Sequence, residues 1–524
     1  MRIDILKIYK SLHTWTGIIA GMALFIAFYA GALTMFKQPI ERWATPPQQQ
    51  LPMVEPAQLD ALVSQIQANH LAAQKAFTLH FGEHENTTAP ISWQQDGSLW
   101  QATLNTQQQL QAQAVAPTEV AELIDLLHQT AGIPGGTGHD RVGIYLMGVI
   151  SVLYALALVS GLIVLLPTLV KDFWALRIGK NLKRLWLDAH NIVGITSLPF
   201  HIIISLSAIV FAFHDQFYDS LEQMVYREQP MFSRSKPAPL PENKQLMPVT
   251  QLLANIKQLA PDFQVADMEY FNLDKPNAMI RVAGMNERFM VRGPDYGYLL
   301  MNPYTGEITN HSLTPGRQDS WSEIITAFFA LHFGNYGGPA LRWVYFVLGL
   351  GGAFLFYSGN LLWVESRRKK QKRNQPTVSQ PRNTRYLAAA TVGVCLGCIA
   401  GVNVGLACSK LLYSLVDELH SWHYLCYYSV FLGCIGWAFY RGAAVAASQL
   451  LTLCSATALL IPASSLLTHV LGYGWLHISA ATLAVDIMAL LAAAGFFLLA
   501  KRSRQRALNG PGDSVWSAID PKTH

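Results

Sequence analysis

The amino-acid sequence predicts a polytopic α-helical membrane protein with about eight transmembrane helices and two small exported α+β domains. Of its 524 residues, 51% are hydrophobic and only 14% are charged, whereas about 25% of the residues in a soluble globular protein are charged. Apolar runs long enough to cross a bilayer recur along the chain. In addition, the order of motifs within residues 1–365 indicates an internal duplication.

Eight apolar runs of about 20 residues are expected to span the membrane. The first, which ends the segment 1–36, is too long for the apolar region of a signal peptide, so we expect it to be retained as a helix. The last four form an additional block over 386–500, in which the sixth and seventh runs are the least distinct. The runs cover 14–36, 142–168, 190–213, 343–364, 386–408, 425–440, 449–469 and 478–500.

Basic residues mark every second connection between the expected helices. Lysine and arginine gather before residue 14, in 169–189, in 365–385 and in the tail 501–524. Because cytoplasmic loops carry the excess of positive charge, this pattern places both termini in the cytoplasm. The long segments 37–141 and 215–341 then lie on the exported side of an inner membrane. The net charge of +5 is therefore a topology signal, and we expect no nucleic-acid partner.

Both exported segments have the pattern of a small α+β domain. Helical periodicity covers 57–69 in the first and 249–259 in the second. Residues 302–306 combine Asn, Pro and Gly as a turn requires. The expected strands cover 76–81, 90–94 and 99–104 in the first segment and 266–272, 278–283, 288–292 and 297–301 in the second.

The duplication joins two copies of a helix–domain–helix unit in the same orientation. Such parallel repeats are related by a pseudo-two-fold axis along the membrane normal. Equivalent residues then face each other, which pairs His13 with His190 near the cytoplasmic side and His128 with His332 near the outer side. The matching motifs are His13, Leu127-His128, Gly135-Gly136, Arg141 and Ser160-Gly161 in one copy, and His190, Leu331-His332, Gly337-Gly338, Arg342 and Ser358-Gly359 in the other.

The paired histidines are candidate haem ligands. His13 precedes Gly17, and His190 precedes Gly194, each at the start of an apolar run. An imidazole can reach the iron, while the glycine one turn later leaves room for a flat porphyrin. Ionisable residues in a membrane are expensive to bury and are functional candidates for that reason.

A third histidine lies deeper in the same run as His190. His201 follows it by eleven residues, which in a continuous helix puts both on one face, about 16 Å apart along the axis. This spacing suits two stacked haems. The first copy has Leu24 at the matching depth, so His201 needs a partner elsewhere, and the candidates are His128, His332 and His139.

The order of these motifs resembles that of the PepSY-associated transmembrane proteins. Tyr-Leu-Leu-Met-Asn-Pro-Tyr-Thr-Gly-Glu-Ile at 298–308 is similar to a PepSY signature, and Leu-His-Phe-Gly follows at 331–334. The family includes inner-membrane siderophore reductases of the ferrioxamine-reductase kind, which hold b-type haems. The resemblance implies two haem b groups, a ferric siderophore as electron acceptor and release of Fe(II). It covers about residues 1–365 and does not cover residues 386–524.

The electron donor is expected to be a quinol or a separate reductase, because the sequence has no glycine-rich dinucleotide-binding motif. Two other functions fit the same residues. In the first, the PepSY-like domains bind or inhibit an exported partner such as a protease, and the histidines are structural. In the second, the protein is a transporter that uses His201 as a proton relay.

Each candidate residue also has a structural interpretation. His13 and His190 can extend to lipid headgroups, His201 can bond a backbone carbonyl freed by Pro199, and His332 can cap the fourth transmembrane helix. Two short motifs remain outside the haem hypothesis. The spacing of His420-x-x-His423, with Asp417 and Glu418 nearby, is compatible with a metal site, and Cys395-x-x-Cys398 fits either small-residue helix packing or a redox or metal pair.

Overall fold

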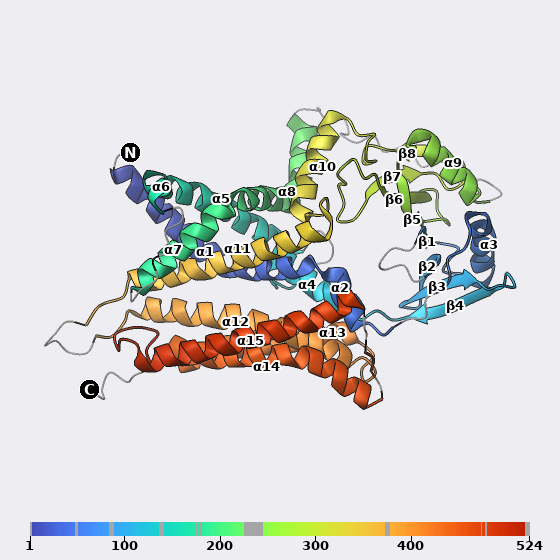
Figure 1. Ribbon diagram of the computed structural model, residues 1–524. Coiled ribbons are helices and arrows are strands. Elements are labelled where there is room, and N and C mark those ends of the chain that lie inside the picture. Colours follow the sequence, from blue (N-terminus) through green and yellow to red (C-terminus); the bar gives the residue numbers. More distant parts are fainter. Residues whose placement is uncertain are drawn as a thin grey trace. The chain divides into compact units, whose positions relative to one another are not determined.

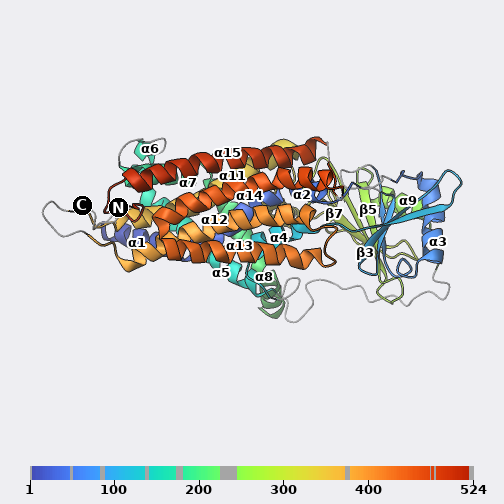
Figure 2. The ribbon, with the colours of Figure 1, turned by 90° about the horizontal axis from the view of Figure 1, so that it is seen from below.

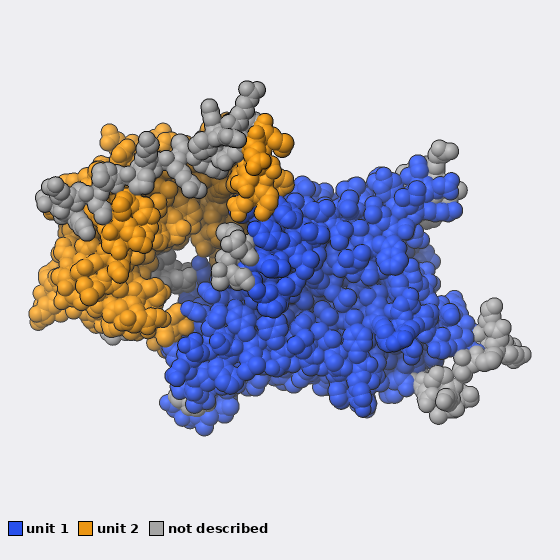
Figure 3. All heavy atoms as spheres, turned by 180° about the vertical axis from the view of Figure 1, so that it is seen from behind, with its two compact units in different colours: residues 1–46, 118–214, 343–524 blue, residues 47–117, 215–342 orange. Residues whose placement is uncertain are grey.

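The computed structural model divides into two compact units (Figure 3). The first comprises residues 1–46, 118–214 and 343–524, and the second comprises 47–117 and 215–342. Among the described residues, every strand belongs to the second unit. The residues that the structure describes are 3–47, 51–82, 89–135, 141–172, 177, 181–224, 245–371, 378–472, 474–476 and 479–518.

Seven of the described helices are long and apolar enough to cross a membrane, which confirms the predicted polytopic helical fold. The expected sixth span falls on α13 (Leu419–Arg441), which is helical but not among the seven, because its histidine, tyrosine and tryptophan residues lower its mean hydropathy. The seven stretches are Asp4–Thr34, Val142–Thr168, Leu198–Ser220, Gly338–Ser366, Arg382–Leu411, Ala443–Val470 and Ala480–Asn509.

Long helices build the first unit, and short helices connect them (Figure 1). Helix α1 packs along α5 and α4. The elements before the C-terminal block are α1 (Ile3–Thr34), α2 (Lys37–Ala44), α4 (Val120–Thr130), α5 (Val142–Leu165), η3 (Leu166–Thr168), α6 (Leu169–Asp172), α7 (Leu182–Thr196), α8 (Leu198–Met224) and α11 (Gly338–Ser366).

The expected continuous span 190–213 is two helices in the structure. Helix α7 ends at Thr196, Ser197 has a non-helical backbone, and α8 begins at Leu198. Pro199 explains the break, because its ring lacks an N–H and collides with the carbonyl four residues earlier. The distance of about 16 Å expected between His190 and His201 assumed an unbroken helix and does not carry over to this geometry.

The C-terminal residues form a block of four packed helices, α12 (Arg382–Leu411), α13, α14 (Ala443–Val470) and α15 (Ala480–Asn509) (Figure 2). Glycines at every fourth position of α12 let α13 approach closely. A Cβ atom on Gly393, Gly397 or Gly401 would lie 2.8, 2.9 or 2.8 Å from an atom of α13. Small residues at this spacing drive helix association in membranes.

A buried lysine joins this block to α2. The Nζ of Lys410 donates to the hydroxyl of Ser465 at 2.8 Å and lies 4.3 Å from the centre of the Trp43 ring. The indole N–H of Trp43 in turn donates to Asp486 at 2.9 Å. Lys410 is 1% exposed, so these contacts offset the cost of burying its charge.

The second unit contains one eight-stranded antiparallel sheet instead of two separate sheets. The strand order is β4-β3-β2-β1-β5-β6-β7-β8, and the two halves meet where β1 pairs with β5, with Phe77 opposite Tyr270. The strands are β1 (Phe77–His80), β2 (Ile91–Gln95), β3 (Ser98–Leu104), β4 (Leu110–Val115), β5 (Gln264–Phe271), β6 (Met279–Met285), β7 (Gly297–Met301) and β8 (Ile308–Asn310).

The helices of this unit agree with the predicted periodicity. Helix α3 (Leu59–Asn69), preceded by η1 (Pro56–Gln58), and helix α9 (Val249–Leu259) bury their apolar faces in the core that the strands share. Residues 288–292, where a strand was expected, do not form one. Strand β4 was not expected, because the three consecutive glutamines at 107–109 and two more at 111 and 113 interrupt the apolar pattern. Helix α10 (Ser320–Phe333) completes the unit.

Candidate functional site

The rings of His13 and His190 are neighbours in a nearly perpendicular, edge-on arrangement, and the duplication predicts that these two residues meet. Their ring centroids are 6.2 Å apart, and the ring planes are inclined by 78°. His13 comes from α1 and His190 from α7, the equivalent positions of the two copies. The structure therefore brings together two histidines that are far apart in the sequence.

Hydrogen bonds fix the tautomer of both rings. The Nδ1 of His13 lies 2.8 Å from the carbonyl oxygen of Ala157, which can only accept, so Nδ1 carries the proton. The Nδ1 of His190 lies 3.1 Å from the Ser358 hydroxyl. That hydroxyl donates to the carbonyl of Leu355 at 3.0 Å, so its oxygen is left to accept from His190. In both rings Nε2 retains its lone pair.

The Ser-Gly pair of each copy forms the surface on which the neighbouring ring rests. A Cβ atom on Gly161 would lie 2.8 Å from the Cε1 of His13, and one on Gly359 would lie 3.5 Å from the Cε1 of His190. The two environments are thus related but not identical. The first is tight enough to exclude an alanine without movement of the ring, and the second has room for one.

The glycines one turn after each histidine are not tightly packed, and only Gly17 faces open space. A Cβ atom on Gly17 would meet nothing within 4 Å, and one on Gly194 would meet only Leu355, at 3.5 Å.

The distance between the two histidine rings suits a shared metal ion. Two imidazoles on opposite sides of one metal ion, with metal–nitrogen bonds of about 2 Å, have ring centroids about 6 Å apart. The distance of 6.2 Å between His13 and His190 fits this requirement. The Nδ1–carbonyl bond of His13 is one that metal-bound histidines usually make, and the Ser358 hydroxyl takes the same place at His190.

An ion pair joins Arg177, in the connection before α7, to Asp188 within α7. The backbone N–H and the Nε of Arg177 both donate to Oδ2 of Asp188 at 2.9 Å. These hydrogen bonds hold the pKa of the Asp188 carboxyl below its ordinary value. Asp188 is only 1% exposed and lies two residues before His190. Sequence reasoning missed this pair, because both residues lie in a basic connection that was interpreted only as a topology signal.

His201 has a different environment from His13 and His190, which are called the inner pair from here on. It is fully buried, its Nδ1 lies 2.5 Å from the hydroxyl of Tyr154, and its Nε2 has no hydrogen-bond partner among the described residues. The rings around it in the described structure are Phe28, Tyr154 and Phe200, with no second histidine. The proposed bond to a backbone carbonyl freed by Pro199 is not formed by Nδ1, which uses the phenol instead.

Of the three candidate partners for His201, the structure describes two. His128 lies in the last turn of α4, where its Nδ1 donates to the carbonyl of Ala27 at 2.9 Å. A Cβ atom on Gly31 would lie 2.6 Å from this ring, so the environment of His128 repeats that of His13. His139 lies outside the described residues.

His332 does not cap the fourth transmembrane helix. It lies in the last turn of α10, which is a separate helix in the second unit, and Gly334 ends that helix with a positive φ of 65°. Glycine at this position satisfies the end of the helix in the usual way. The pairing of His128 with His332 stays a prediction.

In the C-terminal block, the two histidines of the His-x-x-His motif have different partners. His423 is buried with its Nε2 3.0 Å from the Ser409 hydroxyl, whereas His420 lies beside Glu119 of a distant segment. The two histidines of this motif therefore do not form a metal pair.

The cysteine pair fits helix packing. Cys395 and Cys398 are both buried in α12, where the glycines that contact α13 support the packing interpretation.

Comparison with known proteins identifies the family. The model of the PepSY-associated TM region matches residues 10–366, which is more than half of the chain and includes all of the candidate histidines. It leaves the block α12–α15 outside the match. In a comparison with curated proteins, no sequence matches this one. On the family match, the chain belongs to the family of membrane proteins with a PepSY-associated TM region.

Proposed function

We propose that this protein is a haem b-containing reductase of the inner membrane that passes electrons across the bilayer to a ferric siderophore on the exported side, where Fe(II) is released. The observation that carries the proposal is the inner pair. His13 and His190 present two unprotonated Nε2 atoms from rings 6.2 Å apart, each anchored through Nδ1. A haem bound by two histidines supplies one-electron transfer and has no open coordination position for oxygen chemistry.

The residues of the inner site act by positioning. Ala157 and Ser358 hold the two imidazoles in one tautomer, and Gly161 and Gly359 set how far each ring can retreat toward its neighbouring helix. Gly17 and Gly194 add no side chain of their own one turn after each histidine, and the space beside Gly17 is open. Hydrogen bonds to Nδ1 also raise the basicity of the ligand and tune the metal.

The proposal includes a second site that uses His201. Its buried Nε2 lacks a hydrogen-bond partner in the described structure, which is costly unless another group uses it. Among the candidate partners, His128 has the environment most like that of His13, since its Nδ1 donates to a helix carbonyl and a glycine lies against its ring. His332 and His139 are the other two candidates.

Reduction of the siderophore is a one-electron step for each ferric ion. The ferric centre becomes Fe(II), which binds more weakly to hard oxygen ligands, and the siderophore leaves with its ligands intact. A quinol or a separate reductase supplies the electrons, and a two-electron quinol reduces two ferric ions and releases two protons. The exported sheet unit would form the docking surface for the acceptor.

The proposal is tested with the purified full-length chain, made under haem-replete conditions. We expect two non-covalent b-type haems per chain by pyridine haemochrome analysis, since the sequence has no Cys-x-x-Cys-His for covalent attachment. Ferric hydroxamate siderophores should reoxidise the dithionite-reduced protein in stopped-flow measurements. A folded but colourless protein would favour the non-redox or transport alternatives. A red protein that no ferric chelate reoxidises would overturn the substrate.

A further inference from the structure

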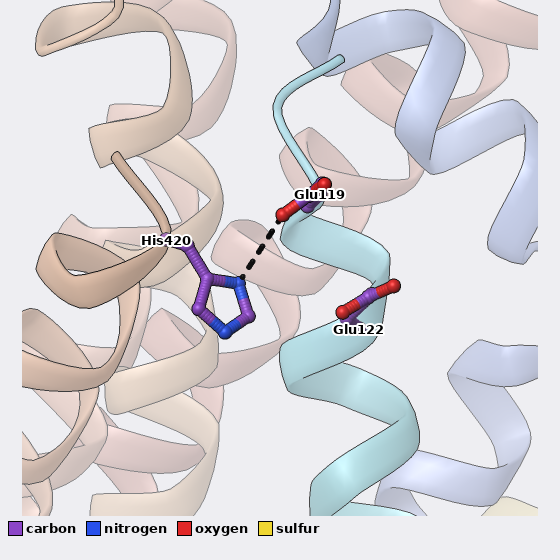
Figure 4. Close-up of side chains that lie close together, drawn as sticks. All are labelled: Glu119, Glu122 and His420. Carbon is purple, nitrogen blue, oxygen red and sulfur yellow. Dashed lines mark ion pairs between the residues drawn. The ribbon is translucent and has the colours of Figure 1, made fainter. Parts of the chain in front are cut away.

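A cluster of three potential metal ligands lies where α4 meets α13 (Figure 4). Glu119 and Glu122 come from the start of α4, and His420 comes from the first turn of α13. One ligand atom from each residue lies within 4.8 Å of the other two. The chain brings together residues nearly 300 positions apart, and none of them belongs to the haem sites proposed above.

The two glutamates are not needed to cap α4. Glu41 from α2 already accepts the N–H of Glu119 at 2.8 Å and the N–H of Ala121 at 3.1 Å, and it also accepts the hydroxyl of Thr118 at 2.8 Å. Acidic residues near a helix start usually satisfy such N–H groups. Because Glu41 does this here, the carboxylates of Glu119 and Glu122 are left to face His420.

The spacing within the cluster suits a shared ion better than direct hydrogen bonds. The Nδ1 of His420 lies 3.6 Å from a carboxylate oxygen of Glu119, which is an ion-pair distance (Figure 4) but is too long for a hydrogen bond. This Nδ1 is buried and has no hydrogen-bond partner among the described residues. Two ligands on one tetrahedral ion with bonds of about 2.1 Å lie about 3.4 Å apart. The observed distance is therefore close to that of two atoms on one metal ion.

A hydrogen bond fixes the two helices that carry the cluster, and the cluster itself contains more negative than positive charge. The hydroxyl of Tyr428 donates to the carbonyl of Gly132 at 2.7 Å, which ties α13 to the end of α4. Glu119 and Glu122 bring two carboxylates within 4.8 Å of each other, where their negative charges repel. A bound cation would relieve this repulsion between carboxylates.

We infer that Glu119, Glu122 and His420 bind one divalent transition-metal ion. Two carboxylates and one imidazole match the ligand preferences of Fe(II), Mn(II) and Zn(II). All three side chains are partly exposed to solvent.

The identity of the ion rests on the proposed function. Glu122 and His128 are six residues apart on α4, which is about 9 Å along the helix axis. If His128 holds the outer haem, the cluster lies about 9 Å along α4 from a ligand of that haem and is therefore close to the place where Fe(II) is released. The site would then be the first binding place of the ferrous product.

The binding site is tested by titrating the oxidised full-length protein with Mn²⁺, whose free ion gives an EPR signal that disappears on binding. We expect one Mn²⁺ per chain, displaced by Zn²⁺, which binds more tightly at such sites. Glu122→Gln and His420→Gln should each weaken binding about tenfold or more. Glu418→Gln is the matched control, because Glu418 is exposed beside the same helix start but outside the cluster. Equal loss in the control, or no displaceable Mn²⁺ in the wild type, would overturn the site.

The role in iron handling needs a separate measurement. After one anaerobic turnover of reduced protein with a ferric hydroxamate chelate, the wild type should retain Fe(II) through rapid desalting, and Glu122→Gln should retain several-fold less. Equal retention would overturn the ferrous role while the Mn²⁺ titration still decides the site. If the wild type reduces no ferric chelate, the proposed function fails, and the Mn²⁺ result is unaffected because it needs no electron transfer.

Discussion

The inner histidines and His201 are both held through Nδ1, but by different kinds of group. His13 and His190 bond to a helix carbonyl and a serine, rest against glycines and face each other across 6.2 Å. His201 bonds to the phenol of Tyr154 and is enclosed by aromatic rings. The difference follows from the duplication, since the inner site is made from equivalent residues, whereas His201 has Leu24 as its counterpart.

The two sites differ in how much room they leave for a bound planar group. At the inner site, Gly17 leaves open space one turn from His13, and both rings are already oriented by hydrogen bonds. At His201, Phe28 and Phe200 occupy the surrounding volume, so a planar group requires these side chains to move. We therefore expect substitutions at the two sites to have separable effects.

The largest separable effect is expected for His201→Ala. This change should remove one of two haems and abolish reoxidation by ferric siderophores, while the inner haem stays reducible by dithionite. Haem content and stopped-flow reoxidation measure both effects. His214→Ala on the same helix is the control, because His214 is not a proposed ligand. Two haems with wild-type spectra in His201→Ala would remove this residue from the path.

Alanine at the two equivalent glycines should reveal the asymmetry within the inner site. In Gly161→Ala the new methyl would lie 2.8 Å from His13, so the ring must move, and haem affinity should fall about 10- to 100-fold. In Gly359→Ala the methyl would lie 3.5 Å from His190, an ordinary contact, and affinity should change little. Competition with apomyoglobin for haem measures both. Identical losses would show that the difference in packing does not matter.

Tyr154→Phe should affect stability at the deeper site without changing the inner site. The variant removes the partner of the His201 Nδ1 and leaves a buried donor or acceptor unsatisfied, at a cost of about 1–3 kcal/mol. Denaturant unfolding measures the cost. Tyr145→Phe on the same helix is the control, since its hydroxyl makes no hydrogen bond in the described structure. A change in the inner haem spectrum of Tyr154→Phe would contradict the separation of the sites.

The smallest effect is expected for Ser358→Ala. The Ser358 hydroxyl bonds to His190, whereas its counterpart Ser160 bonds only to carbonyls of its own helix. Ser358→Ala should therefore reduce haem affinity by about 0.5–1.5 kcal/mol, and Ser160→Ala should have no measurable effect. Redox titration and haem transfer rates compare the two variants. A larger loss in Ser160→Ala would reverse the assignment.

Much of the fold could be predicted from local pattern. Apolar runs and basic connections locate the long helices, and helix α9 begins and ends at the predicted residues 249 and 259. The pairing of His13 with His190 could also be predicted, because a parallel repeat brings equivalent positions together. These features depend on sequence periodicity and order alone.

Features that depend on contacts between distant segments could not be predicted. The two halves of the second unit share one sheet because β1 pairs with β5, a pairing that no turn signals. The break at Ser197 required Pro199 to be given more weight than the apolar run around it. The partner of His201 is a tyrosine in the middle of another helix, and His420 meets glutamates from α4 instead of the neighbouring His423. Local spacing holds no information on such contacts.

The central claim is that His13 and His190 together hold one haem. The most direct test measures haem per chain and the redox-resolved absorbance spectrum of His13→Ala and His190→Ala, beside His311→Ala as an exposed histidine control. The account predicts that both variants lose the same spectral component and retain the other, while the control keeps both. Loss of different components in the two variants, or full haem content in either, would contradict it.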